Sequence, residues 1–154
     1  MCVHCLYSIQ VLAAGKRVYD DGSLFTNLEV ASLEEAIAQF QDETGMDFVV
    51  LTSTLSHGST SSEAVADNYY DEGGFGFDTE HSGVLYYIDM SNRYQHLSTT
   101  GQMIDLMTDE RIQSAIDACR PFLSAGNYGS AALTMLDKVL RFVKLASPED
   151  QYRY

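Results

Sequence analysis

Positive charge is scarce in this sequence. Only 9 of its 154 residues are Lys or Arg, against 22 Asp or Glu, so the formal net charge is -13. Affinity for nucleic acid depends on neutralising phosphates with basic side chains, so we expect no nucleic-acid partner. The charge also disfavours adsorption to anionic lipid and favours a metal cation or a basic partner, unless it serves only to keep the protein in solution.

Long apolar runs are missing as well. No stretch reaches the roughly 18 apolar residues of a membrane-spanning helix, so we predict no membrane span within this chain. The first 16 residues are moderately apolar, and Val11 and Ala13 are spaced as at a signal-peptidase site, but a basic start is lacking. We interpret residues 1–16 as the remnant of an export signal or as a disordered arm.

The three cysteines do not form a recognisable motif. Cys2 and Cys5 make a C-x-x-C pair, but a redox motif would follow a strand and open a helix, and a zinc site would need a second ligand pair. Their role stays open. Cys119 shares a helical face with Ile112 and Ile116, which predicts a small core residue.

Apolar patterning predicts an α/β protein. Residues 47–53 and 83–90 are apolar without polar alternation, which is typical of strands covered on both faces. A helix between them favours a parallel pair with a right-handed crossover, and residues 93–99 are expected to return antiparallel to the second strand. We therefore predict a three-layer α/β/α sandwich with a small mixed central sheet, formed by one domain over 17–146 and followed by a tail over 147–154.

Short polar motifs predict where these elements begin and end. Thr26 with Glu29, and Thr60 with Glu63, have the spacing of capping boxes that open helices. Ser91 and Asn92 fit a two-residue hairpin turn. The run 99–101, Thr-Thr-Gly, most simply turns the chain out of the sheet.

The order of these motifs resembles the TPM-domain family, in its bacterial branch. The resemblance runs from residue 18 to about 143 and is most specific in "DMSNR", "STTG" and "GNYGSAA". It implies an α/β/α sandwich. It also implies two kinds of activity: acid phosphatase chemistry in some members, and accessory roles on membrane complexes in others, which are often exported.

Several polar residues are expected at the carboxyl ends of the parallel strands, where open α/β sheets bind ligands. Asp20 follows a short strand predicted at residues 17–19, and Asp89 and Arg93 lie at the end of the strand predicted over 83–90 and just after it. Carboxylates gathered there would repel one another unless a cation such as Ca²⁺ or Mg²⁺ joined them. The alternative is that Asp20 and Asp89 only cap strands and form turns.

A second acidic pair lies on a helix. Asp67 and Asp71 are four residues apart, so they share a face and are a second candidate for a divalent cation. Since that helix runs back along the sheet, Asp71 should lie near the opposite edge, beside Thr99 and Thr100.

Two further residues are candidates for chemistry. The planar guanidinium of Arg93 matches a phosphate group, although pairing with a neighbouring acid is the simpler interpretation. His57, with Ser56 and Ser59 beside it, suggests a base and nucleophile, but sequence adjacency is poor evidence for that geometry and a polar loop is expected instead.

Two functions follow from these residues and the resemblance. The first is an exported, TPM-like accessory module that docks on a membrane or envelope protein complex and binds a divalent cation. The second is a metal-dependent acid phosphatase acting on phosphomonoesters, with Arg93 as the candidate catalytic residue. No P-loop, Cys-x5-Arg or D-x-D-x-T motif supports the second function.

Overall fold

One mixed sheet of four strands forms the centre of the protein. The computed structural model describes residues 15–145. The strands are β1 (Val18–Asp20), β2 (Asp47–Ser53), β3 (Gly83–Asp89) and β4 (Tyr94–Thr100), in the order β1-β2-β3-β4. β1, β2 and β3 are parallel, and β4 runs antiparallel to β3. The predicted central parallel pair and its antiparallel neighbour are confirmed.

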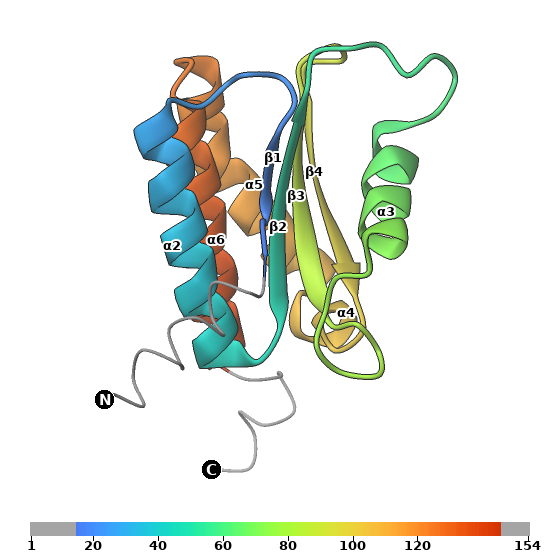
Figure 1. The fold of residues 1–154 in the computed structure, drawn as a ribbon, viewed down its shortest axis with the longest axis vertical. Coiled ribbons are helices and arrows are strands. Elements are labelled where there is room, and N and C mark those ends of the chain that lie inside the picture. Colours follow the sequence, from blue (N-terminus) through green and yellow to red (C-terminus); the bar gives the residue numbers. More distant parts are fainter. Residues whose placement is uncertain (1–14, 146–154) are drawn as a thin grey trace.

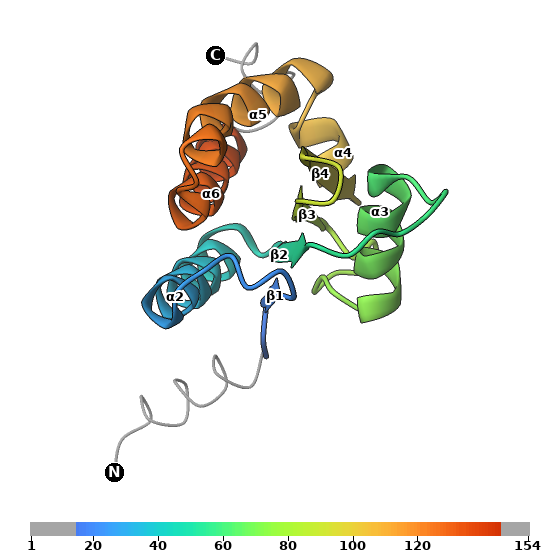
Figure 2. The same ribbon diagram turned by 90° about the horizontal axis from the view of Figure 1, so that it is seen from above.

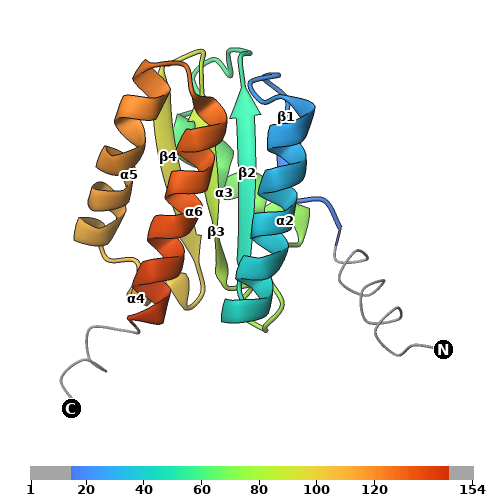
Figure 3. The ribbon, with the colours of Figure 1, turned by 90° about the vertical axis from the view of Figure 1, so that its left-hand side faces the viewer.

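Helices cover both faces of the sheet. One face carries α2 (Asn27–Thr44), α5 (Asp109–Ser124) and α6 (Tyr128–Lys144), and the other carries α3 (Ser62–Gly73) (Figures 1 and 2). The short α4 (Met103–Leu106) follows β4. Seen from the three-helix side, α6 lies between α2 and α5 in front of the sheet (Figure 3). This arrangement confirms the α/β/α sandwich.

The alternation of strand residues divides the core in two. Phe48 and Val50 of β2 pack toward the three-helix layer, while Val49 and Leu51 pack toward α3, and all four are buried. Successive strand residues point to opposite faces, so an uninterrupted apolar run is needed when both faces are covered. Cys119 is buried with the larger cluster, as predicted, and burial raises the pKa of its thiol to about 11.

The two predicted capping boxes have different outcomes. At α2 both halves form: Thr26 Oγ1 accepts from the Glu29 amide at 3.1 Å, and Glu29 accepts from the Thr26 amide at 2.9 Å. At α3 the prediction is wrong by one residue, because Ser61 caps the helix by accepting from the amide of Ala64. The backbone of Thr60 instead closes a turn with His57, which leaves the next hydroxyl to cap the helix.

The connection between β3 and β4 also differs from the prediction. Asp89 pairs with Tyr94, so four residues join the strands instead of a two-residue turn. The Asp89 carboxylate accepts from the amide of Asn92, and Arg93 adopts a left-handed φ of 52° that brings the chain back into the sheet. The side chain of a strand residue therefore shapes this turn, which a turn-residue pattern does not capture.

The Thr-Thr-Gly run ends β4 and begins the turn that leads to α4. Gly101 has a φ of 63°, and a Cβ there would lie 2.4 Å from Ser82 Oγ, so only glycine fits. The interpretations of Cys2 and Cys5, of the N-terminal stretch up to residue 14 and of the tail after residue 145 concern parts of the chain outside the described residues.

Candidate functional site at the carboxyl edge of the sheet

Asp89 is the centre of a buried hydrogen-bond network at the end of β3. Its side chain is fully buried. Its Oδ2 atom accepts from Ser62 Oγ at 2.6 Å and from Asn92 Nδ2 at 2.9 Å, and it lies 2.8 Å from His57 Nε2. The network thus joins the start of α3, the loop before α3 and the β3–β4 turn to one strand end.

Both ring nitrogens of His57 face oxygen atoms in this network. Its Nδ1 lies 2.6 Å from the carbonyl oxygen of Thr60, and its Nε2 faces Asp89. Both neighbours are acceptors, so both ring nitrogens donate and the imidazolium form is favoured. The hydrogen bond to Asp89, with that to Thr60 after it, raises the pKa of His57 above its ordinary value.

Asp89 is correspondingly held as a carboxylate. Burial by itself would raise its pKa, but the hydrogen bonds from Ser62, Asn92 and His57 together lower that pKa below the ordinary value. The geometry and the two pKa directions therefore favour an imidazolium facing a carboxylate. Ser62 donates to the same oxygen that His57 faces, so the hydroxyl is not placed to transfer its proton to the ring.

Asp20 has a structural role at the end of β1. Its carboxylate accepts from the amides of Leu24 and Phe25, both at 2.9 Å, and from Thr52 Oγ1 at 2.6 Å. Thr52 Oγ1 in turn accepts from the amide of Gly22 at 2.9 Å. These contacts shape the turn between β1 and α2, as the turn-forming interpretation of this aspartate proposed.

The sheet register places Asp20 and Asp89 on opposite faces. Asp20 pairs with Thr52, whereas Asp89 pairs with Ser53. Thr52 and Ser53 are consecutive, so their side chains and those of their partners point to opposite sides of the sheet. Within residues 15–145, no group of three or more His, Cys, Asp or Glu side chains is placed to hold a metal ion. The carboxyl edge does not fit a cation shared by these two aspartates.

The acidic pair on α3 is accessible. Asp67 and Asp71 are both exposed, and Asp67 accepts a hydrogen bond from Ser98 Oγ on β4. Asp71 lines a cavity of about 330 Å³ together with Thr100, which agrees with its expected place near the end of β4. The structure therefore leaves these carboxylates at a different site from Asp20 and Asp89.

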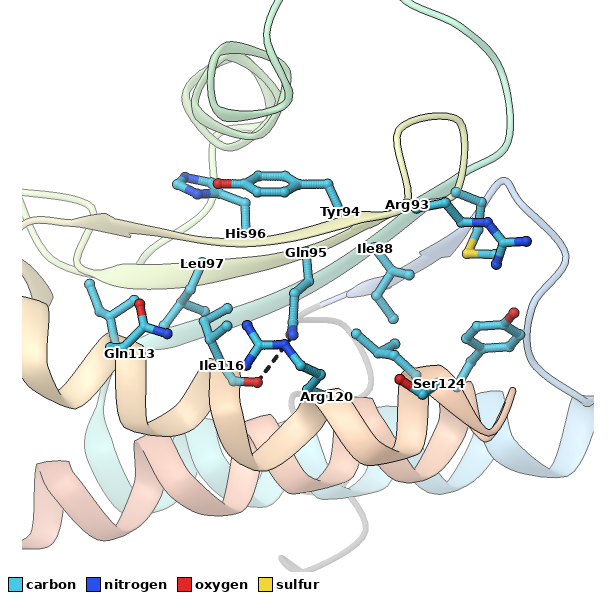
Figure 4. Close-up of a pocket in the computed structure, with 14 residues that line it drawn as sticks. Ile88, Arg93, Tyr94, Gln95, His96, Leu97, Gln113, Ile116, Arg120 and Ser124 are labelled. Carbon is cyan, nitrogen blue, oxygen red and sulfur yellow. Dashed lines mark hydrogen bonds between the residues drawn. The ribbon is translucent and has the colours of Figure 1, made fainter.

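Arg93 lines a groove that does not include Asp89 among its lining residues. Its side chain is exposed and lines a groove between β4 and α5, together with Arg120 (Figure 4). Among residues 15–145 its guanidinium has neither an ion pair nor a hydrogen bond, so the simple pairing with a neighbouring acid is not observed. Arg120, also exposed, pairs with Asp117 at 2.7 Å.

Comparison with known proteins now agrees with this architecture. The family model of the TPM domain matches residues 18–142, most of the chain. The chain belongs to the TPM-domain family. No curated protein matches the sequence.

Solved structures resemble this TPM domain in fold. The N-terminal domain of a protein from P. gingivalis has a TM-score of 0.73 at 17% identity, covering 90% of this chain and 88% of that one. The BA42 protein from Bizionia argentinensis has a TM-score of 0.70 at 15% identity, covering 80% and 84%. The N-terminal domain of cg2496 from Corynebacterium glutamicum has a TM-score of 0.60 at 16% identity, covering 80% and 76%. At these identities the likeness shows the fold alone.

The sequence pattern missed two charged pairs of this TPM domain. The sequence associates His57 only with its neighbouring serines, but its partner Asp89 is 32 positions away. At the opposite edge of the sheet, Arg17 Nε pairs with the buried Asp47 at 2.8 Å, and Gln41 donates to the same carboxylate at 3.0 Å. A lone aspartate at the start or end of an apolar strand was the available signal, since a buried carboxylate requires partners.

None of the helices within residues 15–145 has the length and apolar character to span a bilayer.

Proposed function

We propose that this TPM domain is an exported accessory module of the cell envelope, and that it acts by docking on a membrane or envelope protein complex. The observation that carries this proposal is the closed network around Asp89. Three side chains direct donors to one oxygen of the Asp89 carboxylate, so this carboxylate serves to hold neighbouring segments of the fold together. A side chain held in this way is a poor nucleophile and a poor metal ligand unless its donors first move away.

One further observation supports a docking role. The similar domains from P. gingivalis and C. glutamicum are each the N-terminal domain of a protein, which fits a module that works beside other segments. The placement in the envelope rests on the resemblance to exported members and on the export-signal interpretation of residues 1–16.

The alternative is a metal-dependent acid phosphatase acting on phosphomonoesters. The presence of His57, Ser62 and Asp89 in one network favours it, since phosphate chemistry uses such groups. Against it, Ser62 and His57 both face the carboxylate, and Arg93 lies in another groove. The net charge of -13 also repels phosphorylated substrates.

Hydrolysis of a generic aryl phosphate separates the two functions. We expect weak or no turnover by protein free of host phosphatases, and any activity should depend on added Ca²⁺ or Mg²⁺. Asp89→Asn and Arg93→Ala are measured beside the wild type, with circular dichroism to confirm that each remains folded. Robust turnover that either substitution abolishes would establish the phosphatase and reject the docking module.

The proposal includes weak binding of Ca²⁺ or Mg²⁺ by Asp67 and Asp71. These carboxylates are exposed, and oxygen ligands suit both ions. In a titration followed by NMR, the amides near Asp71 should shift at millimolar concentrations, and Asp71→Asn should reduce the shifts. The amides near Asp20 and Asp89 are the internal control. Shifts confined to those amides would contradict the assignment to α3.

A further inference from the structure

The groove beside β4 has an unusual lining. It measures about 420 Å³ and lies between β4 and α5. Five consecutive residues, 93–97, line it from one side, and the apolar side chains of Ile112, Ile116 and Leu123 line it from α5. Arg93 and Arg120 add two positive charges to a chain in which such charges are few.

Consecutive lining residues show that the groove follows the edge of the strand. Side chains alternate along a strand, so a cavity above one face would be lined by every second residue. Figure 4 shows this alternation: Gln95 and Leu97 point toward α5, whereas Tyr94 and His96 point to the opposite side of the sheet. A groove that all of them line therefore extends along the backbone of β4 itself.

β4 is an edge strand that is exposed or half-buried over residues 94–96 and buried at Leu97 and Ser98. β4 is the last strand in the sheet order, and within residues 15–145 it pairs with β3 alone. Exposed strand edges are commonly protected by Pro, Lys or very short length. β4 is seven residues long, and its sequence YQHLSTT contains neither residue.

We propose that β4 binds an extended peptide segment of a partner protein by strand addition. The proposal rests on the docking function proposed above and names its surface. The backbone of the segment would pair with the outer edge of β4, and alternate side chains would enter the groove over Ile116 and Leu123. The inner polar side chain of β4, Gln95, is already satisfied, since it donates to the Ile116 carbonyl at 3.1 Å and accepts from Tyr86.

Charge identifies the kind of segment. Arg93 has no ion pair among the described residues, and Arg120 has only an exposed pair with Asp117 on its own helix, so both can receive carboxylates. The segment should alternate apolar residues with one or two acidic residues. A second copy of this chain is a poorer occupant, because each copy has a net charge of -13 and the two would repel each other.

Selection of random twelve-residue displayed peptides on the full chain tests the proposal. We expect the recovered peptides to alternate apolar residues and to contain acidic ones. In complex with the tightest peptide, backbone amides within residues 94–100 that face outward should become protected from hydrogen exchange. Two further versions of that peptide, N-methylated at the odd or at the even residues, keep its side chains but lose half of its backbone N–H donors. The version that loses the donors facing β4 should bind at least tenfold more weakly than the unmodified peptide.

Charge reversal tests the role of the two arginines. The double variant Arg93→Glu, Arg120→Glu should lower the affinity for the selected peptide at least tenfold, with the thermal midpoint of unfolding measured to confirm folding. Arg141→Glu reverses one positive charge on α6, outside the groove, and should leave the affinity within twofold.

The outcomes separate this inference from the docking function itself. Failure to recover any binding peptide, peptides that protect another surface, or a concentration-dependent dimer that protects β4 without peptide would each reject peptide addition at β4. These results are independent of the phosphatase assay, which tests the docking function. Robust turnover lost in Asp89→Asn would reject the docking function, whatever the peptides do.

Discussion

The carboxyl edge of the sheet and the β4 groove use charged side chains in opposite ways. At the edge, Asp89 is buried and receives hydrogen bonds from three elements of the chain. In the groove, Arg93 is exposed and no described residue pairs with it. A buried charge needs partners supplied by the fold, whereas an exposed charge keeps its capacity for a ligand. The first arrangement stabilises the protein, and the second leaves a surface for binding.

Removal of the Asp89 carboxylate should give the largest loss of stability among the substitutions that test this comparison. In Asp89→Ala, the donors of Ser62, Asn92 and His57 lose their acceptor, and we expect a loss of about 3 kcal/mol in the free energy of unfolding. Chemical denaturation measures it. Asp21→Ala, on an exposed aspartate near the same edge, is the control and should change stability by less than about 0.5 kcal/mol. Equal effects of the two substitutions would show that the network does not stabilise the fold.

Substitutions of Arg93 should change stability by less, and through the backbone conformation of the turn. Its φ of 52° lies in the left-handed region, which costs a residue with a Cβ roughly 1 kcal/mol. Arg93→Gly and Arg93→Ala remove the same charge, so their difference isolates the backbone. The glycine variant should be about 1 kcal/mol more stable than the alanine variant by chemical denaturation, because the left-handed conformation of the turn outweighs the flexibility of glycine in the unfolded chain. The reverse order would mean that the turn relaxes when the arginine is removed.

The ionisation of His57 gives the smallest expected effect and tests the His57–Asp89 pair alone. Its raised pKa means that its stabilising effect is complete below pH 6.5, its ordinary value, and is lost as the pH rises through the folded-state pKa. Asp89 adds a second limit: its lowered pKa gives stabilisation above pH 3.8, lost as the pH falls through the folded value. An NMR titration of the His57 ring should show the raised pKa in the wild type.

Asp89→Asn provides the control for that titration. The substitution removes the carboxylate that is the largest cause of the shift, so the pKa of His57 should return toward its ordinary value. His96, whose pKa is lowered mainly by burial, is an internal reference and should titrate unchanged in the variant. An unaltered His57 would show that Asp89 is not the group that holds its proton.

Local sequence patterns predicted most of the fold. The apolar runs of β2 and β3 indicate burial on both faces, and the Thr26–Glu29 box marks the start of α2, because these signals depend on neighbours within a few residues. Ser61 and the four-residue β3–β4 connection departed from the pattern because other local hydrogen bonds form: the amide of Thr60 donates to the carbonyl of His57, and the amide of Asn92 donates to the carboxylate of Asp89.

The candidate sites depended on tertiary structure. The sequence by itself determined that Asp20 and Asp89 end parallel strands and that Arg93 follows a turn. Only the register of β2 decided that the two aspartates face opposite sides of the sheet, since a shift of one residue reverses every side chain. Only the packing of α5 beside the edge strand β4 brought Arg93 and Arg120 to one groove, because a strand and a helix distant in sequence meet there through burial of apolar surface.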